Sequence, residues 1–278
     1  MKFDLARVGS VRESEEFRVN THRLAQFAAA LGDDNPAHAA GRIAPPVFAH
    51  IPVMQSLVEE LRIVTDGFVI HGEHDFHFHR PIEPGQRLFT RSVLQRVANS
   101  KAGVQLVVRA ETQTHDGTLL CVQYSGCLVQ GASVEADKGE PPPARPLGTA
   151  GRALGAVTVT LPDDQAALYA EAARDYSAYT LDAAAAKAKG FPAPILHGMC
   201  TIALASRAVV DQGCGGDTRR LKRLGCRFSH PLYMTGGQRL TTTLQEGGSE
   251  RGRQILRFES LDAGGHPVIR NGFAEIQP

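Results

Sequence analysis

The spacing of apolar residues near the start of the chain predicts a short amphipathic helix. Four apolar residues recur at i, i+3, i+4 and i+7 and therefore share one helix face: Leu24, Phe27, Ala28 and Leu31. Thr21 precedes them and suits the N-cap position. Gly32 follows them and suits the C-terminal cap, because glycine readily adopts the left-handed conformation. We therefore expect a helix between Thr21 and Gly32.

Similar patterns predict helices farther along the chain. Pro162 suits the first position of a helix, and Asp163 and Asp164 behind it would complement the positive N-terminal end. Two more helices each carry an apolar stripe that we expect in the core. These stripes are Met54, Leu57, Val58 and Leu61 in one helix, and Cys200, Ala203, Leu204 and Ala208 in the other.

Beyond these helices the pattern changes to a period of two, which is typical of strands. Alternate residues between 104 and 110 are apolar, namely Val104, Leu106, Val108 and Ala110. Gln105, Arg109 and Glu111 occupy most of the positions between and after them. Each half of the chain therefore reads as helices followed by an antiparallel sheet, which is an α+β arrangement.

The segment 131–152 divides the chain into two nearly equal parts. It has almost no large apolar residue and contains three consecutive prolines, so we interpret it as a semi-rigid linker. We expect an N-terminal domain over 1–130 and a C-terminal domain over 153–278.

The two domains repeat the same order of motifs. The first has FHRPIEPGQRL at 78–88, and the second has FSHPLYMTGGQRL at 228–240. Farther upstream, LGDDNPAH at 31–38 corresponds to ARDYSAYT at 173–180, and APPVFAHIPVMQSL at 44–57 corresponds to APILHGMCTIAL at 193–204. Because the order is the same in both halves, we interpret the chain as a tandem repeat.

Composition and charge exclude several classes of protein. The 30 basic and 29 acidic residues nearly cancel, which argues against a nucleic-acid-binding surface. We find no apolar run of about 18 residues, as a membrane-spanning helix would need. The N-terminus lacks the apolar core of a signal peptide, and the five cysteines form no CxxC pair. We therefore expect reduced thiols and a cytoplasmic location.

The segment from Gly32 to His38 is the strongest candidate for chemistry. Pro36 fixes its own φ and disfavours the helical region for Asn35, so Asp33 and His38 should emerge from a stiff turn. A carboxylate and an imidazole held in this way can act on one water molecule, one orienting it and the other moving its proton. That chemistry suits the addition of water to an activated double bond, or its removal. The alternative is that Asp33 only caps the turn and His38 lies at the surface.

Taken together, GDDNPAH and the later PAPILHGMC segment resemble the MaoC-like, R-specific enoyl-thioester hydratases. The likeness covers both halves and implies a double hotdog fold, in which each repeat is a long helix wrapped by a curved antiparallel sheet. It implies that Asp33 and His38 are the catalytic pair. It implies an acyl thioester as substrate, carried by coenzyme A or an acyl carrier protein, and neither a metal nor another cofactor. The two repeats would form a pseudo-dimer within one chain, and the resemblance is also compatible with a homodimer of two such chains.

The second repeat departs from the family pattern. It keeps Asp175 but has Ser177, Ala178 and Thr180 where the pattern has Asn, Pro and His. The family's helix-opening glycine, whose N–H binds the thioester oxygen, corresponds to Gly198 in the second half and to His50 in the first. The complete pair and the glycine therefore lie in different repeats. We expect six residues to bind substrate, namely Asn35, His50, Asp175, Thr180, His197 and Gly198.

Four histidines lie close together in HGEHDFHFH at 71–79. On a regular strand His71, His77 and His79 would share a face, and no carboxylate or cysteine at ligand spacing completes a metal site. We therefore expect strand-surface histidines there.

Three functions remain open from the sequence. The first is a hydratase or dehydratase acting at the 2,3-position of an acyl thioester. A hotdog thioesterase is the second, but it would not need Asn35, Pro36 and His38 beside Asp33. The third is a non-catalytic acyl-binding protein, suggested by the division of the motif between the repeats.

Overall fold

One antiparallel sheet runs through both halves of the chain in the computed structural model, which describes residues 2–278. Its strands follow the order β1-β4-β5-β6-β3-β9-β12-β11-β10-β8, and β2 and β7 also pair with β4. The first half contributes β1 (Val11–Glu13), β2 (Phe17–Arg18), β3 (Ile70–Phe78), β4 (Arg87–Ser100), β5 (Gly103–Thr114), β6 (Leu119–Gln130) and β7 (Lys138–Gly139). The second half contributes β8 (Ala153–Thr160), β9 (Leu221–Phe228), β10 (Arg239–Glu250), β11 (Arg253–Leu261) and β12 (Pro267–Ile276).

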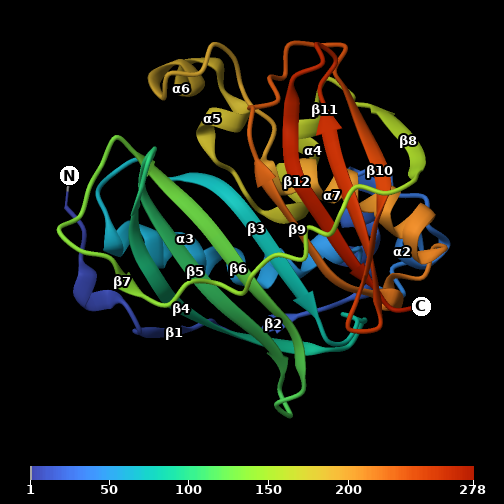
Figure 1. Ribbon diagram of the computed structural model, residues 1–278, viewed down its shortest axis with the longest axis horizontal. Coiled ribbons are helices and arrows are strands. Elements are labelled where there is room, and N and C mark those ends of the chain that lie inside the picture. Colours follow the sequence, from blue (N-terminus) through green and yellow to red (C-terminus); the bar gives the residue numbers. More distant parts are fainter. Residues whose placement is uncertain (1) are drawn as a thin grey trace.

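Helices from both halves accompany this curved sheet, and the central helix of each half packs against it (Figure 1). Those of the first half are η1 (Leu5–Arg7), α1 (Thr21–Ala30), α2 (Pro36–Ala39), η2 (Pro46–Val53) and α3 (Met54–Val64). Those of the second half are α4 (Gln165–Ala173), α5 (Ala178–Leu181), α6 (Ala183–Ala188), α7 (Gly198–Ala208), η3 (Val209–Gly213) and η4 (Thr218–Arg220). The central helix of the first half starts as the 3₁₀ helix η2, and Pro52 within it has no N–H to donate. This arrangement of one curved sheet and two central helices confirms the α+β double hotdog fold predicted from the sequence.

The two halves join where β3 pairs antiparallel with β9. The register runs from Glu73 opposite Arg227 to His77 opposite Arg223. Across this seam, Asp75 accepts hydrogen bonds from Nε and Nη2 of Arg223 at 2.9 and 2.6 Å, and both side chains are buried. Burial, the largest single influence, would raise the pKa of Asp75, but the hydrogen bonds and charges of Arg223 and His77 together outweigh it and hold that pKa below the ordinary aspartate value. The two halves are therefore one body, held by backbone pairing and a buried ion pair.

The segment between the halves crosses the outer face of the sheet at this seam (Figure 1). Arg145 forms an ion pair with Glu73 of β3 at 2.7 Å, and the carbonyl of Ala144 accepts a hydrogen bond from Arg223 of β9 at 2.9 Å. The segment is thereby fixed to both halves.

A hydrophobic core also continues from one half into the other. The rings of Phe27 in α1 and Tyr169 in α4 lie 6.0 Å apart, and both are buried. Gln165 donates to the carbonyl of Ala30 at 2.7 Å, so the pair of helices is joined by polar contact as well. The stripe predicted for α7 is confirmed, since Cys200, Ala203, Leu204 and Ala208 are all buried. The same is true of the alternating apolar residues of β5, namely Val104, Leu106, Val108 and Ala110.

Two predicted helix starts are wrong by a few residues. The N-cap of α1 is Asn20, whose side chain accepts from the N–H of Arg23 at 2.9 Å, while Thr21 is already helical. Helix α4 begins at Gln165, because a turn intervenes in which the Gln165 N–H donates to the carbonyl of Pro162. The predicted cap at Gly32 is confirmed by its positive φ of 59°.

The apolar stripe predicted for α3 is only partly correct. Leu57 is buried, but Met54, Val58 and Leu61 are only half-buried. The fully buried positions instead include two polar residues, Ser56 and Glu60.

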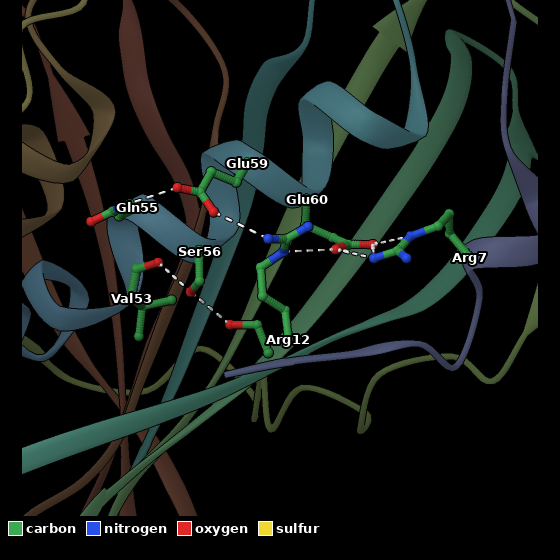
Figure 2. Close-up of polar contacts among 8 residues, drawn as sticks. Arg7, Arg12, Val53, Gln55, Ser56, Glu59 and Glu60 are labelled. Carbon is green, nitrogen blue, oxygen red and sulfur yellow. Dashed lines mark hydrogen bonds and ion pairs between the residues drawn. The ribbon is translucent and has the colours of Figure 1, made fainter. Parts of the chain in front are cut away.

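Charge pairing explains the buried carboxylate of Glu60 (Figure 2). Arg7 from η1 contacts its two oxygens at 2.8 and 3.1 Å, and Arg12 from β1 approaches one of them at 3.3 Å. Glu59, the next residue on α3, binds the other end of Arg12 at 3.2 Å. The N-terminal segment thus covers α3 through ion pairs, which an apolar stripe could not reveal.

The expectation of strand-surface histidines in β3 is wrong for His71 and His74. The strand pairing shifts register between His71 and Glu73, so an irregularity at Gly72 brings His71 and His74 to the same side. His74 is fully buried, and its Nδ1 lies 3.1 Å from Nε2 of His71.

We predict that Asp75→Asn will destabilise the whole chain by about 3 kcal/mol, because Arg223 would keep a buried charge without its main partner. Urea unfolding at pH 7 measures this change. Because the pKa of Asp75 is lowered on folding, its contribution is present above the ordinary aspartate pKa and is lost as the pH falls through the lower folded value. Glu246→Gln, which removes an exposed partner of Arg152, is the control and should cost less than about 1 kcal/mol. Equal effects of the two variants would contradict the importance of the seam.

Candidate active site

The loop after α1 places Asp33 and His38 beside each other. Gly32 turns the chain out of the helix, and the N–H of Asp33 donates back to the carbonyl of Ala28 at 2.9 Å. Asn35 then caps the short helix α2 by accepting from the N–H of Ala37 at 3.0 Å. Because both ends of the loop are capped, the two side chains are held by ordered backbone.

A direct hydrogen bond joins the predicted catalytic pair. Nδ1 of His38 lies 2.8 Å from Oδ2 of Asp33, and both residues are buried. Oδ1 of the same carboxylate accepts from the N–H of Asn35 at 3.1 Å. Since an ionised carboxylate only accepts, Nδ1 of His38 carries the proton and its Nε2 has the free lone pair. Asp33 therefore fixes the orientation and tautomer of His38 and leaves Nε2 as the atom that can accept a proton.

The second half of the chain completes this site. The hydroxyl of Thr218 in η4 lies 2.6 Å from Nε2 of His38, and the Asn35 amide donates to the carbonyl of Gly216 at 2.8 Å. The sequence prediction missed Thr218, because it matches no motif and lies 180 residues from His38.

A pocket of about 100 Å³ opens beside Thr218. Its inner wall is mostly apolar, including Ile43, Ala44, Phe78, Ile82, Cys121 and Leu221. Pro45, Pro46 and Ala49 from the start of η2 also line it. Three basic side chains, Arg80, Arg219 and Lys222, complete the wall. The pocket lining thus combines apolar and basic side chains, and Thr218, which also lines it, contacts His38.

A second group of predicted residues lies around Asp175. Its carboxylate accepts from the backbone N–H and the hydroxyl of Ser177 at 3.2 and 2.7 Å. Thr180, in the position that corresponds to His38, lies 2.9 Å from Nε2 of His197, and the same nitrogen donates to the backbone carbonyl of Asp175 at 3.0 Å. The structure therefore brings Asp175, Thr180 and His197 together without forming a carboxylate–imidazole pair there.

His197 and Gly198 open helix α7 within this second group. Burial lowers the pKa of His197, although the Asp175 charge opposes this shift. The His197 ring packs 5.1 Å from that of Tyr169. A Cβ on Gly198 would meet the ring of Phe228 at 3.4 Å, so an aromatic ring lies directly against this helix start.

His50 belongs to a third, buried group. The side-chain oxygen of Gln123 lies 3.1 Å from Nδ1 of His50 and 3.2 Å from Nε2 of His74. The side-chain amide of Gln123 donates to the carbonyl of Ala49. Burial is the main cause that lowers the pKa of His50, and it lowers the pKa of His71 to about 3. These imidazoles are therefore neutral at pH 7.

Two family models match the chain, one on each half. The MaoC-like domain model matches residues 146–262, and the FAS1-like dehydratase domain region matches residues 6–122. Each half of the chain thus matches a dehydratase-type family model, and the second half contains a MaoC-like domain. The resemblance read from GDDNPAH and PAPILHGMC is thereby confirmed.

Relatives of this chain include several named enzymes. It is 28% identical over 205 residues to peroxisomal enoyl-CoA hydratase 2 of Arabidopsis thaliana, covering 68% of this chain and 65% of the relative. It is 27% identical over 221 residues to peroxisomal multifunctional enzyme type 2 of Mus musculus, covering 75% of this chain but only 28% of that enzyme. A 3-hydroxyacyl-thioester dehydratase of Mycobacterium tuberculosis is 24% identical over 200 residues, covering 71% of this chain and 68% of the relative.

Solved structures show the same architecture. A MaoC-like dehydratase from Phytophthora capsici superimposes with a TM-score of 0.81 at 21% identity, covering 99% of this chain and 98% of that one. A Mycobacterium tuberculosis protein described as a double hotdog gives a TM-score of 0.62 at 17% identity, covering 96% of this chain and 95% of that one. These matches confirm the predicted double hotdog fold.

We predict that His38 carries its proton on Nδ1 at neutral pH, because Asp33 accepts there. Nitrogen-15 NMR of histidine-labelled protein distinguishes a protonated ring nitrogen from a bare one. Thr218→Val should leave this tautomer unchanged, since Asp33 alone sets it, and the exposed His115 serves as the reference in the same spectra. A proton on Nε2 of His38 in the parent protein would contradict the arrangement.

Proposed function

We propose that this chain is an (R)-specific enoyl-thioester hydratase or 3-hydroxyacyl-thioester dehydratase. The observation that carries the proposal is the buried Asp33–His38 pair, whose Nε2 lies 2.6 Å from the hydroxyl of Thr218 at the wall of a mostly apolar pocket. The names of its relatives, enoyl-CoA hydratase 2 and 3-hydroxyacyl-thioester dehydratase, support the reaction class.

The proton chemistry follows from the tautomer of His38. In hydration, Nε2 accepts a proton from water as the water oxygen bonds to C3 of the enoyl group. The electrons of the double bond move toward the thioester carbonyl, and Nε2 of the imidazolium then returns the proton taken from water to C2, which restores the neutral imidazole. Asp33 stabilises the imidazolium that forms, as a carboxylate paired to a histidine does. Dehydration runs through the same steps in reverse.

The surroundings of the pair suit an acyl thioester. The start of η2 lines the same pocket as Thr218, whereas Gly198 packs against Phe228 in the other group. We infer that the positive end of η2 faces the thioester carbonyl oxygen, where it would stabilise developing negative charge. Arg80, Arg219 and Lys222 would face the phosphate groups that both coenzyme A and the prosthetic arm of an acyl carrier protein contain.

The other predicted substrate-binding residues take different parts in this proposal. Asn35 positions the pair through its bonds to Ala37 and Gly216. His50, Asp175, Thr180, His197 and Gly198 lie in the two other groups, so we assign them to the shape of the acyl-binding region and not to proton transfer. A cytoplasmic location and a homodimer remain predictions of the sequence.

The two alternative functions make different products. A hotdog thioesterase would release a free thiol, and a non-catalytic binding protein would return the thioester unchanged. The intact hydrogen bond between Asp33 and His38 favours a catalyst over a binding protein.

We predict that Asp33→Asn and His38→Ala each lower kcat/KM for enoyl-thioester hydration by about 10²–10⁴, or about 3–5 kcal/mol of barrier. The double variant should be little worse than the single ones, because the two residues act as one unit. The loss of absorbance at the enoyl band measures the rate, and circular dichroism confirms that each variant folds.

Asp175→Asn and Thr180→Ala are the matched controls in the second repeat. Each should keep most of the hydration rate and change KM or chain-length preference instead. If Asp175→Asn abolished activity while His38→Ala retained it, the working site would lie in the second repeat.

A further inference from the structure

A trio of metal-ligating side chains lies at one end of the sheet, in the second half. Asp262 and His266 flank the turn between β11 and β12, and His230 follows β9 by two residues. Strand β12 pairs with both neighbours, so Ile269 lies opposite Phe228 and Ser260. This pairing brings the turn and the segment after β9 together, at the upper end of β11 and β12 in Figure 1.

Backbone bonds hold the two segments in place. The N–H of Ser229 donates to the carbonyl of Val268 at 3.1 Å, and its hydroxyl contacts the carbonyl of Pro267. Oδ1 of Asp262 accepts from the N–H groups of Gly264 and His266 at 2.9 and 2.8 Å. The carboxylate is therefore fixed by the turn, and its Oδ2 has no backbone partner among these bonds.

The three donor groups converge. Nδ1 of His266 lies 3.1 Å from Oδ2 of Asp262, and the rings of His230 and His266 are stacked with centroids 4.8 Å apart. One donor atom from each residue lies within 4.8 Å of the other two, and among residues 2–278 no other trio of His, Cys, Asp or Glu meets this criterion. Donors about 2.0–2.2 Å from a common ion are a little over 3 Å apart, so small side-chain rotations would complete the set.

We propose that His230, Asp262 and His266 form a binding site for a divalent transition-metal ion, with Zn²⁺ as the best fit. Two imidazole nitrogens and one carboxylate oxygen are borderline ligands that suit Zn²⁺ and its neighbours, whereas Mg²⁺ and Ca²⁺ prefer sites made of oxygen. His266 is 60% exposed, so an ion can reach it from solvent, and a set of three protein ligands leaves a fourth coordination position for water.

A metal ion here would link the turn between β11 and β12 to the segment that contacts the start of helix α7. The segment after His230 continues to Leu232 and Met234, which bond to Leu196 and Pro194 at 2.8 Å each. Those two residues directly precede His197 and Gly198 at the start of the helix. Binding should therefore stabilise this end of the second half and raise the unfolding temperature, because the folded form alone presents the three ligands together.

The first half contains a natural control. The turn between β5 and β6 corresponds to the turn between β11 and β12 and carries His115 and Asp116. There the Asp116 carboxylate contacts the hydroxyl of Thr114, and the group around it includes no second histidine within the donor distances above. His115→Gln thus removes an exposed histidine from a similar hairpin without touching the trio.

The test is calorimetric titration of the full chain with Zn²⁺ after treatment with a chelator, followed by Co²⁺ titration read by visible absorption. We expect one equivalent to bind, and an excess of Mg²⁺ not to compete. His230→Gln and His266→Gln each remove a direct ligand, so each should weaken Zn²⁺ binding by more than roughly 10–100-fold. That range is the cost of losing a residue that only hydrogen-bonds to a metal ligand. Asp262→Asn should weaken it while keeping the two backbone bonds of the turn.

The unfolding temperature provides a second readout. Zn²⁺ should raise it for the parent protein and for His115→Gln, but not for His230→Gln or His266→Gln, which circular dichroism must show to be folded. The proposal is overturned if Zn²⁺ does not bind, if binding survives both histidine substitutions, or if His115→Gln weakens it equally.

Discussion

The pairing of β3 with β9 is the interaction on which the rest of the structure depends. It turns two sheets into one and brings the buried ion pair of Asp75 and Arg223 to the centre of the molecule. A buried ion pair has a large desolvation cost, so it is retained only with complete hydrogen bonding, and here both carboxylate oxygens accept from the guanidinium. The linker also bonds to both strands at this seam. The two halves are therefore held in a fixed position relative to each other, so residues from both halves can meet in one place.

That fixed relation allows the two repeats to differ. The first repeat supplies Asp33, Asn35 and His38, and the second supplies Gly216 and Thr218 from the other side of the same site. The corresponding position in the second repeat is filled by Thr180 and His197, packed with Tyr169.

Much of this could be predicted from the sequence, because periodicity and the repeat are local or regularly spaced. The stripe of α7, the alternation of β5 and the stiff turn around Pro36 depend on neighbouring residues and were predicted correctly. What could not be predicted depends on distant contacts. Glu60 is buried because Arg7 and Arg12 reach it, and His71 lies beside His74 because of the irregularity at Gly72. Thr218 and the trio of His230, Asp262 and His266 belong to the same class, since only the tertiary fold brings them to their partners.

Hydration of an enoyl thioester in water enriched with oxygen-18 tests the account most directly. The purified chain is incubated with a trans-2-enoyl thioester, and the products are followed by mass spectrometry. We expect a 3-hydroxyacyl thioester that carries one labelled oxygen, with its thioester bond intact, and little of this product with His38→Ala. Free thiol with an unhydrated acyl chain, or a thioester recovered unchanged by the parent protein, would contradict the assignment of Asp33 and His38 to the addition and removal of water.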